Sequence, residues 1–130
     1  MKKIMVDCEI EVTLHMIGGK CKPLILYYLM EHSPKRFGEL LSYINQLSQK
    51  TLTNQLRELE ADGLITRTAY AVIPPKVEYA ITEKGKSLQP ILEQMCIWGE
   101  KNIDERFELL NPQCEEVSMQ LHGTETPDLL

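Results

Sequence analysis

A stretch of the chain between residues 48 and 61 concentrates side chains that can bond the edges of DNA bases. Its apolar residues Leu52, Leu56 and Leu59 follow helical spacing, so one face is expected to be buried. Lysine and arginine bond guanine or phosphate, asparagine pairs with adenine, and the threonine methyl contacts thymine. At about 100° per residue, the residues that fall opposite the leucine stripe are Lys50, Thr53, Asn54 and Arg57. We predict a DNA-reading helix, with an ordinary solvated polar face as the alternative.

The charge of the chain is divided unevenly along its length. The formal net charge is −5, which by itself argues against nucleic acid, because DNA affinity depends on lysine and arginine. Residues 20–76, however, hold eight Lys and Arg against five Asp and Glu, whereas residues 93–130 have a net charge of −7. Two solvated surfaces would also give this division. If the basic part meets DNA, the predicted phosphate contacts are Lys35, Arg36, Arg67 and Lys76.

The sequence lacks the patterns that indicate catalysis or metal binding. The cysteines at positions 8, 21, 96 and 114 have no Cys-x-x-Cys spacing, so reduced thiols are expected rather than a zinc ribbon. The three histidines are isolated, and no glycine-rich phosphate loop follows a strand. No apolar run approaches the roughly 18 residues that cross a bilayer. We expect a cytoplasmic protein that is no enzyme, has no membrane partner and holds no metal or cofactor.

The order of the predicted elements indicates the fold class. Helices are expected over residues 9–17, 20–32, 37–44 and 48–61, and strands over residues 64–70 and 77–81. A further helical pattern begins after Thr82 and continues to Leu110 around Pro90, which should kink or divide it. Helices followed by a hairpin are typical of a winged helix-turn-helix, here mainly α with a small two-stranded β wing.

The last predicted helix carries more apolar surface than a three-helix core of this size can cover. Its stripe consists of Leu92, Met95, Trp98, Ile103 and Phe107. A ligand pocket lined by part of this stripe is the less favoured alternative. We predict a homodimer formed by this helix and the first helix, within a domain of residues 1–110 that is followed by an acidic, mobile tail over residues 111–130.

Several short motifs occur in order between Cys8 and Glu100. They are Ile17-Gly18-Gly19-Lys20, Pro34-Lys35-Arg36-Phe37, Leu47-Ser48-Gln49-Lys50, Leu56-Arg57-Glu58-Leu59-Glu60-Ala61-Asp62-Gly63-Leu64, Pro74-Pro75-Lys76-Val77-Glu78-Tyr79 and Thr82-Glu83-Lys84-Gly85. Together they resemble the HxlR-type winged-helix transcriptional regulators. The resemblance implies that Ser48 to Glu60 is the recognition helix, which adds Ser48 and Gln49 to the candidate DNA contacts. It also implies that residues 64–81 are the wing and that the first and last helices form a homodimer interface.

The resemblance also bears on Cys8. Some members of this family use an amino-terminal cysteine at this place to sense oxidants or electrophiles, which makes Cys8 a candidate redox residue. The neighbouring carboxylates of Asp7, Glu9 and Glu11 oppose formation of a thiolate, so an unreactive thiol at a helix start is the alternative. The chain also differs from the family pattern in having Cys21 where tryptophan is usual and Glu9 where proline is common.

These observations predict a sequence-specific transcriptional regulator that binds double-stranded DNA as a homodimer on a pseudo-palindromic operator. Its effector, a small molecule or an oxidant, is left open. The alternative function is a winged-helix protein-interaction module that does not bind DNA specifically, which the acidic net charge of −5 supports.

Overall fold

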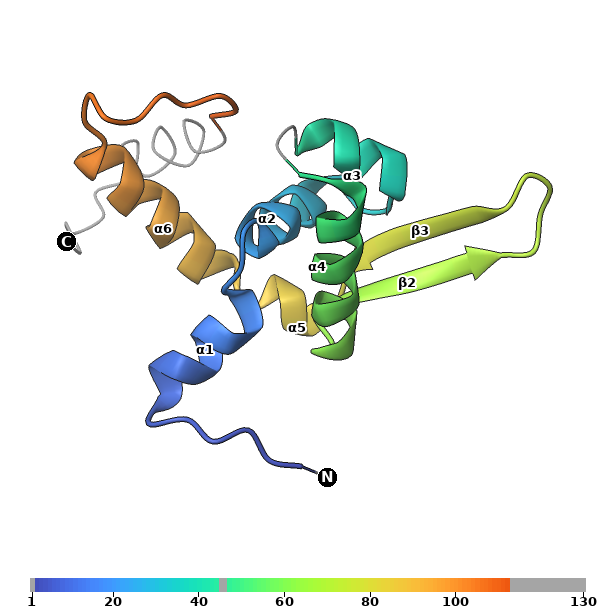
Figure 1. Ribbon diagram of the computed structural model, residues 1–130, viewed down its shortest axis with the longest axis horizontal. Coiled ribbons are helices and arrows are strands. Elements are labelled where there is room, and N and C mark those ends of the chain that lie inside the picture. The colour runs from blue at the N-terminus through green and yellow to red at the C-terminus, as the bar shows by residue number, and fades with distance from the viewer. Residues whose placement is uncertain (1, 45–46, 113–130) are drawn as a thin grey trace. The chain divides into compact units, whose positions relative to one another are not determined.

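The computed structural model describes residues 2–44 and 47–112. It consists of two compact units, residues 1–87 and 88–130, which are described separately. Figure 1 shows the elements of both units. Their bounds are α1 (Glu9–Ile17), α2 (Lys22–His32), β1 (Lys35–Arg36), α3 (Phe37–Tyr43), α4 (Gln49–Ala61), β2 (Ile65–Tyr70), β3 (Lys76–Ile81), α5 (Glu83–Lys86) and α6 (Gln89–Asn102). No described helix is long and apolar enough to cross a membrane.

The core of the first unit is built from leucine and isoleucine side chains of α2, α3 and α4. The predicted stripe of α4 is confirmed, because Leu52, Leu56 and Leu59 are at most 2% exposed. Burying one such side chain contributes about 1.5 to 3 kcal/mol, so this stripe holds α4 firmly against its neighbours. The other fully buried side chains of this unit include Ile25, Leu26 and Leu29 of α2, Leu40 of α3 and Leu64.

Both ends of α4 are capped as the sequence predicts. The Ser48 hydroxyl oxygen accepts a hydrogen bond of 3.1 Å from the Thr51 amide, which satisfies a free donor in the first turn. At the other end, Gly63 has a positive φ of 75°. Its amide donates to the Glu60 carbonyl, and the Leu64 amide reaches back to the Leu59 carbonyl, the pattern that ends a helix after a left-handed glycine.

The wing hairpin is part of a three-stranded antiparallel sheet with the order β1-β3-β2. Strands β2 and β3 pair from Ile65 opposite Ile81 to Tyr70 opposite Lys76. The sequence predicts only these two strands. The third strand, β1, has two residues and pairs with β3, and so short a segment has no alternation from which it could be recognised.

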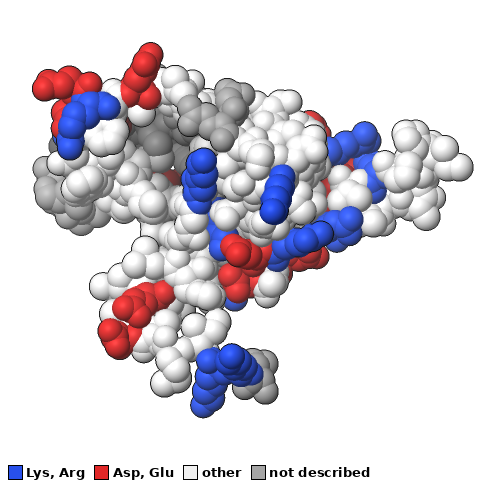
Figure 2. All heavy atoms as spheres, in the orientation of Figure 1, with Lys and Arg blue, Asp and Glu red and all other residues white. Residues whose placement is uncertain are grey.

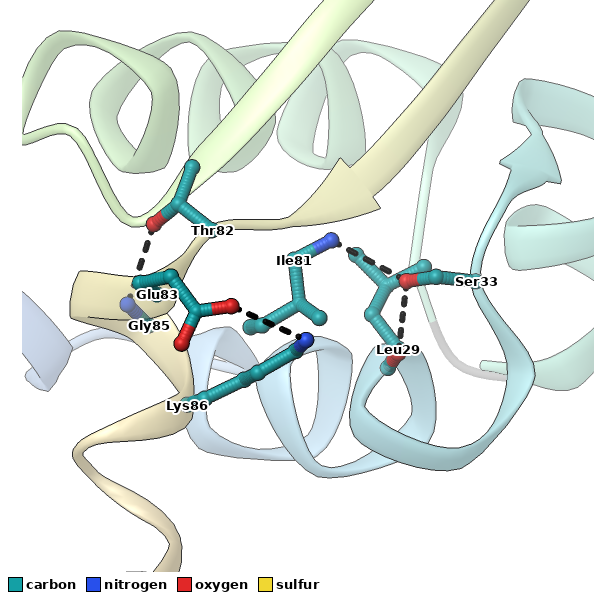
Figure 3. Close-up of polar contacts among 7 residues, drawn as sticks. All are labelled: Leu29, Ser33, Ile81, Thr82, Glu83, Gly85 and Lys86. Carbon is teal, nitrogen blue, oxygen red and sulfur yellow. Dashed lines mark hydrogen bonds and ion pairs between the residues drawn. The ribbon is translucent and has the colours of Figure 1, made fainter.

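Side-chain hydrogen bonds fasten the base of the wing to the helices (Figure 3). The Ser33 hydroxyl donates to the Leu29 carbonyl at the end of α2, at 2.6 Å, and accepts from the Ile81 amide of β3, at 3.0 Å. The Thr82 hydroxyl oxygen accepts from the Gly85 amide at 3.0 Å and so caps α5, as predicted. The wing therefore begins from a fixed base beside the three core helices.

The helical pattern after Thr82 is divided near Pro90, as predicted, but its predicted continuation to Leu110 is wrong. Helix α6 begins at Gln89, with Pro90 in its first turn, and ends at Asn102. Ile103 is extended, with φ −67° and ψ 139°. The Asp104 carboxylate binds both the amide and the guanidinium of Arg106 at 3.0 Å, and this local turn competes with a further helical turn. The predicted tail lies outside the described residues from residue 113 onward.

Candidate nucleic-acid interface

Helix α4 presents its predicted polar residues away from the core. Lys50, Asn54 and Arg57 are exposed, and Thr53 is half-buried. Within the described part of the chain, no carboxylate forms an ion pair with Lys50 or Arg57. Figure 2 shows Lys and Arg side chains over α4 and over the part of the hairpin that lies next to the helices. The outer face of α4 therefore offers cationic and amide groups to an anionic partner.

The hydroxyl groups of Thr53 in α4 and of its N-cap residue Ser48 already form hydrogen bonds within the helix and its cap. The Thr53 hydroxyl donates to the Gln49 carbonyl at 2.8 Å, which leaves its methyl group as the part suited to an outside contact. The Ser48 hydroxyl caps the helix and also donates to the Thr51 hydroxyl at 3.0 Å. Both Ser48 and Gln49 are exposed at the amino-terminal end of α4.

The four predicted phosphate contacts lie on one sheet, on two different faces of it. Lys35 of β1 and Arg67 of β2 both stand opposite Tyr79 of β3, so the three side chains share one face. Arg36 stands opposite Glu78 on the next row, and Lys76 is two residues from Glu78. Arg36 and Lys76 therefore belong to the other face. Sequence reasoning missed this division because it depends on the pairing of β1.

Ion pairs divide these four cations in a second way. The Lys35 ammonium lies 3.3 Å from the Glu39 carboxylate, and the Lys76 ammonium lies 2.7 Å from Glu78. The amide of Arg36, and then Lys35, lower the pKa of Glu39 by hydrogen bonding. Among the described residues, no carboxylate pairs with the side chain of Arg36 or Arg67. These two arginines, one on each face, remain available to phosphate.

One lysine of the basic segment is not part of any outer surface. Lys22, at the start of α2, is 4% exposed, and its ammonium lies 2.6 Å from the carboxylate of Glu58 on α4. Lys22 therefore cannot contact phosphate, although it contributes to the positive charge of residues 20–76. The one signal in the sequence is its place in the first turn of α2, directly before the apolar run from Pro23 to Met30.

The expectation of reduced thiols is wrong for Cys96, which is disulfide-bonded. The two free thiols of the described residues, Cys8 and Cys21, lie in opposite environments. Cys8 is exposed at the amino-terminal cap of α1, next to Glu9 and Glu11 in the first turn. Cys21 is 4% exposed, and burial raises its pKa to about 11. Within residues 2–44 and 47–112, no cluster of three or more His, Cys, Asp or Glu side chains could hold a metal ion.

The predicted dimer residues differ in exposure. Leu92 is 3% exposed and is thus already buried in the single chain. Met95 and Trp98 of α6 are about half exposed, at 49% and 56%, and Ile103 and Phe107 beyond the helix are also exposed. On α1, in the first unit, the exposed apolar side chains include Ile10, Val12 and Leu14. Apolar surface of this kind is typical of an interface between chains.

A helix with a polar outer face, held on a small helical core and followed by an antiparallel hairpin, defines a winged helix-turn-helix protein. Residues 16–107 match the model of the family described as HxlR-like helix-turn-helix. The chain belongs to this family, and the relatives to which it is similar are HTH-type transcriptional regulators.

Similar proteins support the same assignment. The chain is 52% identical, over 96 residues, to the HTH-type transcriptional regulator BH0655 of Halalkalibacterium halodurans, covering 74% of this chain and 85% of that protein. The structure of the redox regulator HypR in its oxidized form is similar, with a TM-score of 0.70, 48% identity and coverage of 75% and 99%. The reduced transcriptional regulator YodB of B. subtilis has a TM-score of 0.65, 34% identity and coverage of 80% and 100%.

Proposed function

We propose that the protein is a sequence-specific DNA-binding transcriptional regulator that acts as a homodimer on a pseudo-palindromic operator. The observation that carries this proposal is the outer face of α4, where Lys50, Asn54 and Arg57 are exposed while the leucine stripe behind them is buried. These residue types form the usual hydrogen bonds with guanine and adenine edges in the major groove. A helix capped at both ends holds them in a fixed arrangement.

The sheet suits a role beside the recognition helix. A β-ribbon can enter a groove of DNA, and phosphate contacts made beside the recognition helix set the position of the protein on the duplex. Arg67 lies on one face of the sheet and Arg36 on the other, and neither is held by a carboxylate in the described part of the chain. We infer that these arginines position the protein on DNA, whereas α4 selects the sequence.

A two-fold dimer would supply the second recognition helix. The exposed apolar residues of α1 and α6, among them Leu14, Met95 and Trp98, are the proposed contacts between the subunits. Two symmetric α4 helices bind half-sites whose centres are about 34 to 36 Å apart, or a multiple of this distance. The operator should therefore be a pseudo-palindrome.

We further propose that oxidation of Cys8 to a disulfide with a second thiol modifies DNA binding. Diamide as the oxidant takes up the two electrons and the two thiol protons. Cys8 is exposed at the N-cap position of α1, the helix of the proposed dimer interface. The similar protein HypR is a redox regulator. A small rotation of the subunits changes the spacing of the two recognition helices, and DNA affinity depends on that spacing. Diamide treatment of wild type and Cys8→Ser tests this directly. Loss of affinity in the wild type alone is expected, and equal loss in both, or in neither, would exclude Cys8.

The function is tested by recovering the DNA that the full-length protein selects. Genomic fragments bound by the purified protein should share a pseudo-palindromic sequence, and that sequence should be protected from cleavage when the protein binds. Fragments without a common sequence, bound no better than random DNA, would instead favour the protein-interaction module.

A further inference from the structure

The ion pair between Lys22 and Glu58 joins two helices at positions where each helix disfavours the charge. Lys22 is the first residue of α2, and a helix amino terminus carries partial positive charge. Glu58 lies in the last turn of α4, where the partial charge is negative. The two groups are nevertheless 2.6 Å apart, with the lysine side chain only 5% exposed. Local helix preferences therefore do not explain why these residues are present.

Stability does not explain the pair either. Removing a lysine ammonium from water carries a large desolvation penalty, which the attraction to one carboxylate offsets only in part. The Glu58 side chain is 57% exposed, so solvent screens this attraction further. An apolar side chain at position 22 would fill the same buried space without that penalty. What an apolar contact lacks is direction.

Direction matters for α4 because its outer residues must meet bases at fixed positions. Glu58 lies about 40° around the helix from Asn54 and about 100° from Arg57. A rotation of α4 by about 20° would move side chains near the helix surface by about 2 Å. This displacement exceeds the spread of hydrogen-bond lengths, so it would break contacts with base edges. The close-packed leucine stripe also restrains rotation, but the hydrophobic attraction itself has no direction, so the ion pair adds a restraint of defined geometry.

A second contact lies on the same side of α4, one turn earlier. Gly19, in the link between α1 and α2, has a φ of 146°, and a Cβ built there would lie 2.7 Å from the Gln55 side-chain oxygen. Gln55 and Glu58 are three residues apart, so they are neighbours on the helix surface. The segment from Gly19 to Lys22 thus lies against α4 at two successive turns.

We propose that Lys22 is a positioning residue, whose ion pair with Glu58 fixes the rotation of α4 about its axis and thereby the sequence preference of the protein. This inference rests on the proposed function of α4 in reading DNA. It concerns discrimination between sequences rather than total affinity or stability.

Two single substitutions break the pair with opposite changes of charge. Lys22→Met removes a positive charge and fills the buried space with an unbranched apolar side chain. Glu58→Gln removes a negative charge and keeps the shape of the side chain. Glu60→Gln is the matched control, because Glu60 is exposed on the same helix and belongs to no ion pair in the described part of the chain. Circular dichroism establishes that each variant is folded.

The measurement is the ratio of affinities for the selected operator and for random DNA of equal length, at one salt concentration. Charge alone should lower the affinity for random DNA in Lys22→Met and raise it in Glu58→Gln and Glu60→Gln. We expect the ratio to fall by about tenfold in Lys22→Met and by at least about threefold in Glu58→Gln, with Glu60→Gln within about twofold of the wild type. A wild-type ratio in Lys22→Met or in Glu58→Gln overturns the proposal.

Amide hydrogen exchange in the free protein separates this inference from the proposed function. Exchange along residues 49–61 should be faster in Lys22→Met and Glu58→Gln than in Glu60→Gln, because α4 loses a directional contact. A wild type that prefers no DNA sequence would overturn the proposed function. Exchange unchanged in both pair variants would overturn the positioning role of Lys22 whatever the DNA result.

Discussion

The four cations of the sheet differ in the contacts that each would lose on binding phosphate. Lys35 and Lys76 are held by Glu39 and Glu78, and the Lys76 ammonium also lies 4.8 Å from the centre of the Tyr70 ring. Each lysine loses its partner when it turns to DNA. Arg36 and Arg67 are exposed and lose no such contact. The four cations carry equal charges but are therefore unequal as proposed DNA contacts.

The salt dependence of DNA affinity should reveal this difference. Arg36→Ala and Arg67→Ala should each reduce the slope of log affinity against log salt concentration by about 1, the value for one phosphate contact. Lys35→Ala and Lys76→Ala should reduce the slope by clearly less. Titrations at four or five salt concentrations measure the slopes. The same reduction in all four variants would contradict the role assigned to the ion pairs.

Base contacts should respond differently from phosphate contacts. Asn54→Ala and Arg57→Ala should each cost about 1 to 3 kcal/mol on the operator and relax the preference at one base position. Thr53→Val is the matched control, because the Thr53 hydroxyl already donates to the Gln49 carbonyl and valine keeps the outward methyl group. Binding to operators with single base changes provides the measurement. Unchanged preference in Arg57→Ala would show that another face of the protein meets the bases.

The two described thiols should differ in reactivity. Alkylation requires a thiolate, and burial raises the pKa of Cys21 to about 11. Iodoacetamide at pH 8 should therefore modify the exposed Cys8 and leave Cys21 unmodified until the protein is unfolded in denaturant. Mass spectrometry of the tryptic peptides gives the modified fraction at each site. Modification of Cys21 as fast as Cys8 would contradict its burial.

At the scale of elements, the sequence predicts best those features that a few neighbouring residues determine. The leucine stripe and the caps Ser48 and Gly63 give α4 almost residue by residue, and Thr82 gives the start of α5. Strand β1 is not predictable from its two residues, because only its pairing with β3 defines it. The apolar residues Ile103 and Phe107 continue a helical spacing, yet the contact between Asp104 and Arg106 ends the helix before them.

In the candidate interface, too, the sequence predicts the features that neighbouring residues determine and not those that depend on distant residues. The outward residues of α4 follow from helical spacing and are predicted from the sequence. The burial of Lys22 against Glu58 joins residues far apart in the chain, and no local pattern shows it. The distribution of the cations over two faces of the sheet likewise depends on the register of β1.

Two glycine substitutions should change stability in opposite directions. Gly63→Ala forces alanine into a left-handed conformation, with φ 75°, which costs about 1 to 2 kcal/mol. Gly38→Ala lies in α3, where an added Cβ meets nothing within 4 Å, and should stabilise by about 0.5 to 1 kcal/mol. Urea denaturation measures both. Destabilisation by Gly38→Ala, or a neutral Gly63→Ala, would contradict the geometry of these helix positions.

For the whole molecule, the proposed dimer interface consists of exposed apolar residues of α1 and α6. Trp98→Lys places a charge in the proposed dimer interface and should convert the dimer to a monomer. Ile73→Lys is the matched control, because Ile73 is fully exposed at the hairpin tip, outside that interface. Sedimentation equilibrium at micromolar concentration measures the mass. A monomeric wild type, or a dimeric Trp98→Lys, would contradict the proposed dimer.

With a net charge of −5, the proposed function depends mainly on preference for a DNA sequence. An acidic protein gains less from non-specific attraction to phosphates than a basic one, so its binding depends more on base contacts. We propose that α4 reads DNA sequence. The property to measure is the affinity of the wild-type protein for its selected fragment and for a scrambled fragment of equal length and composition, at physiological salt. The selected fragment should bind at least about a thousandfold more tightly. Equal affinity for the two fragments would show that α4 does not read sequence.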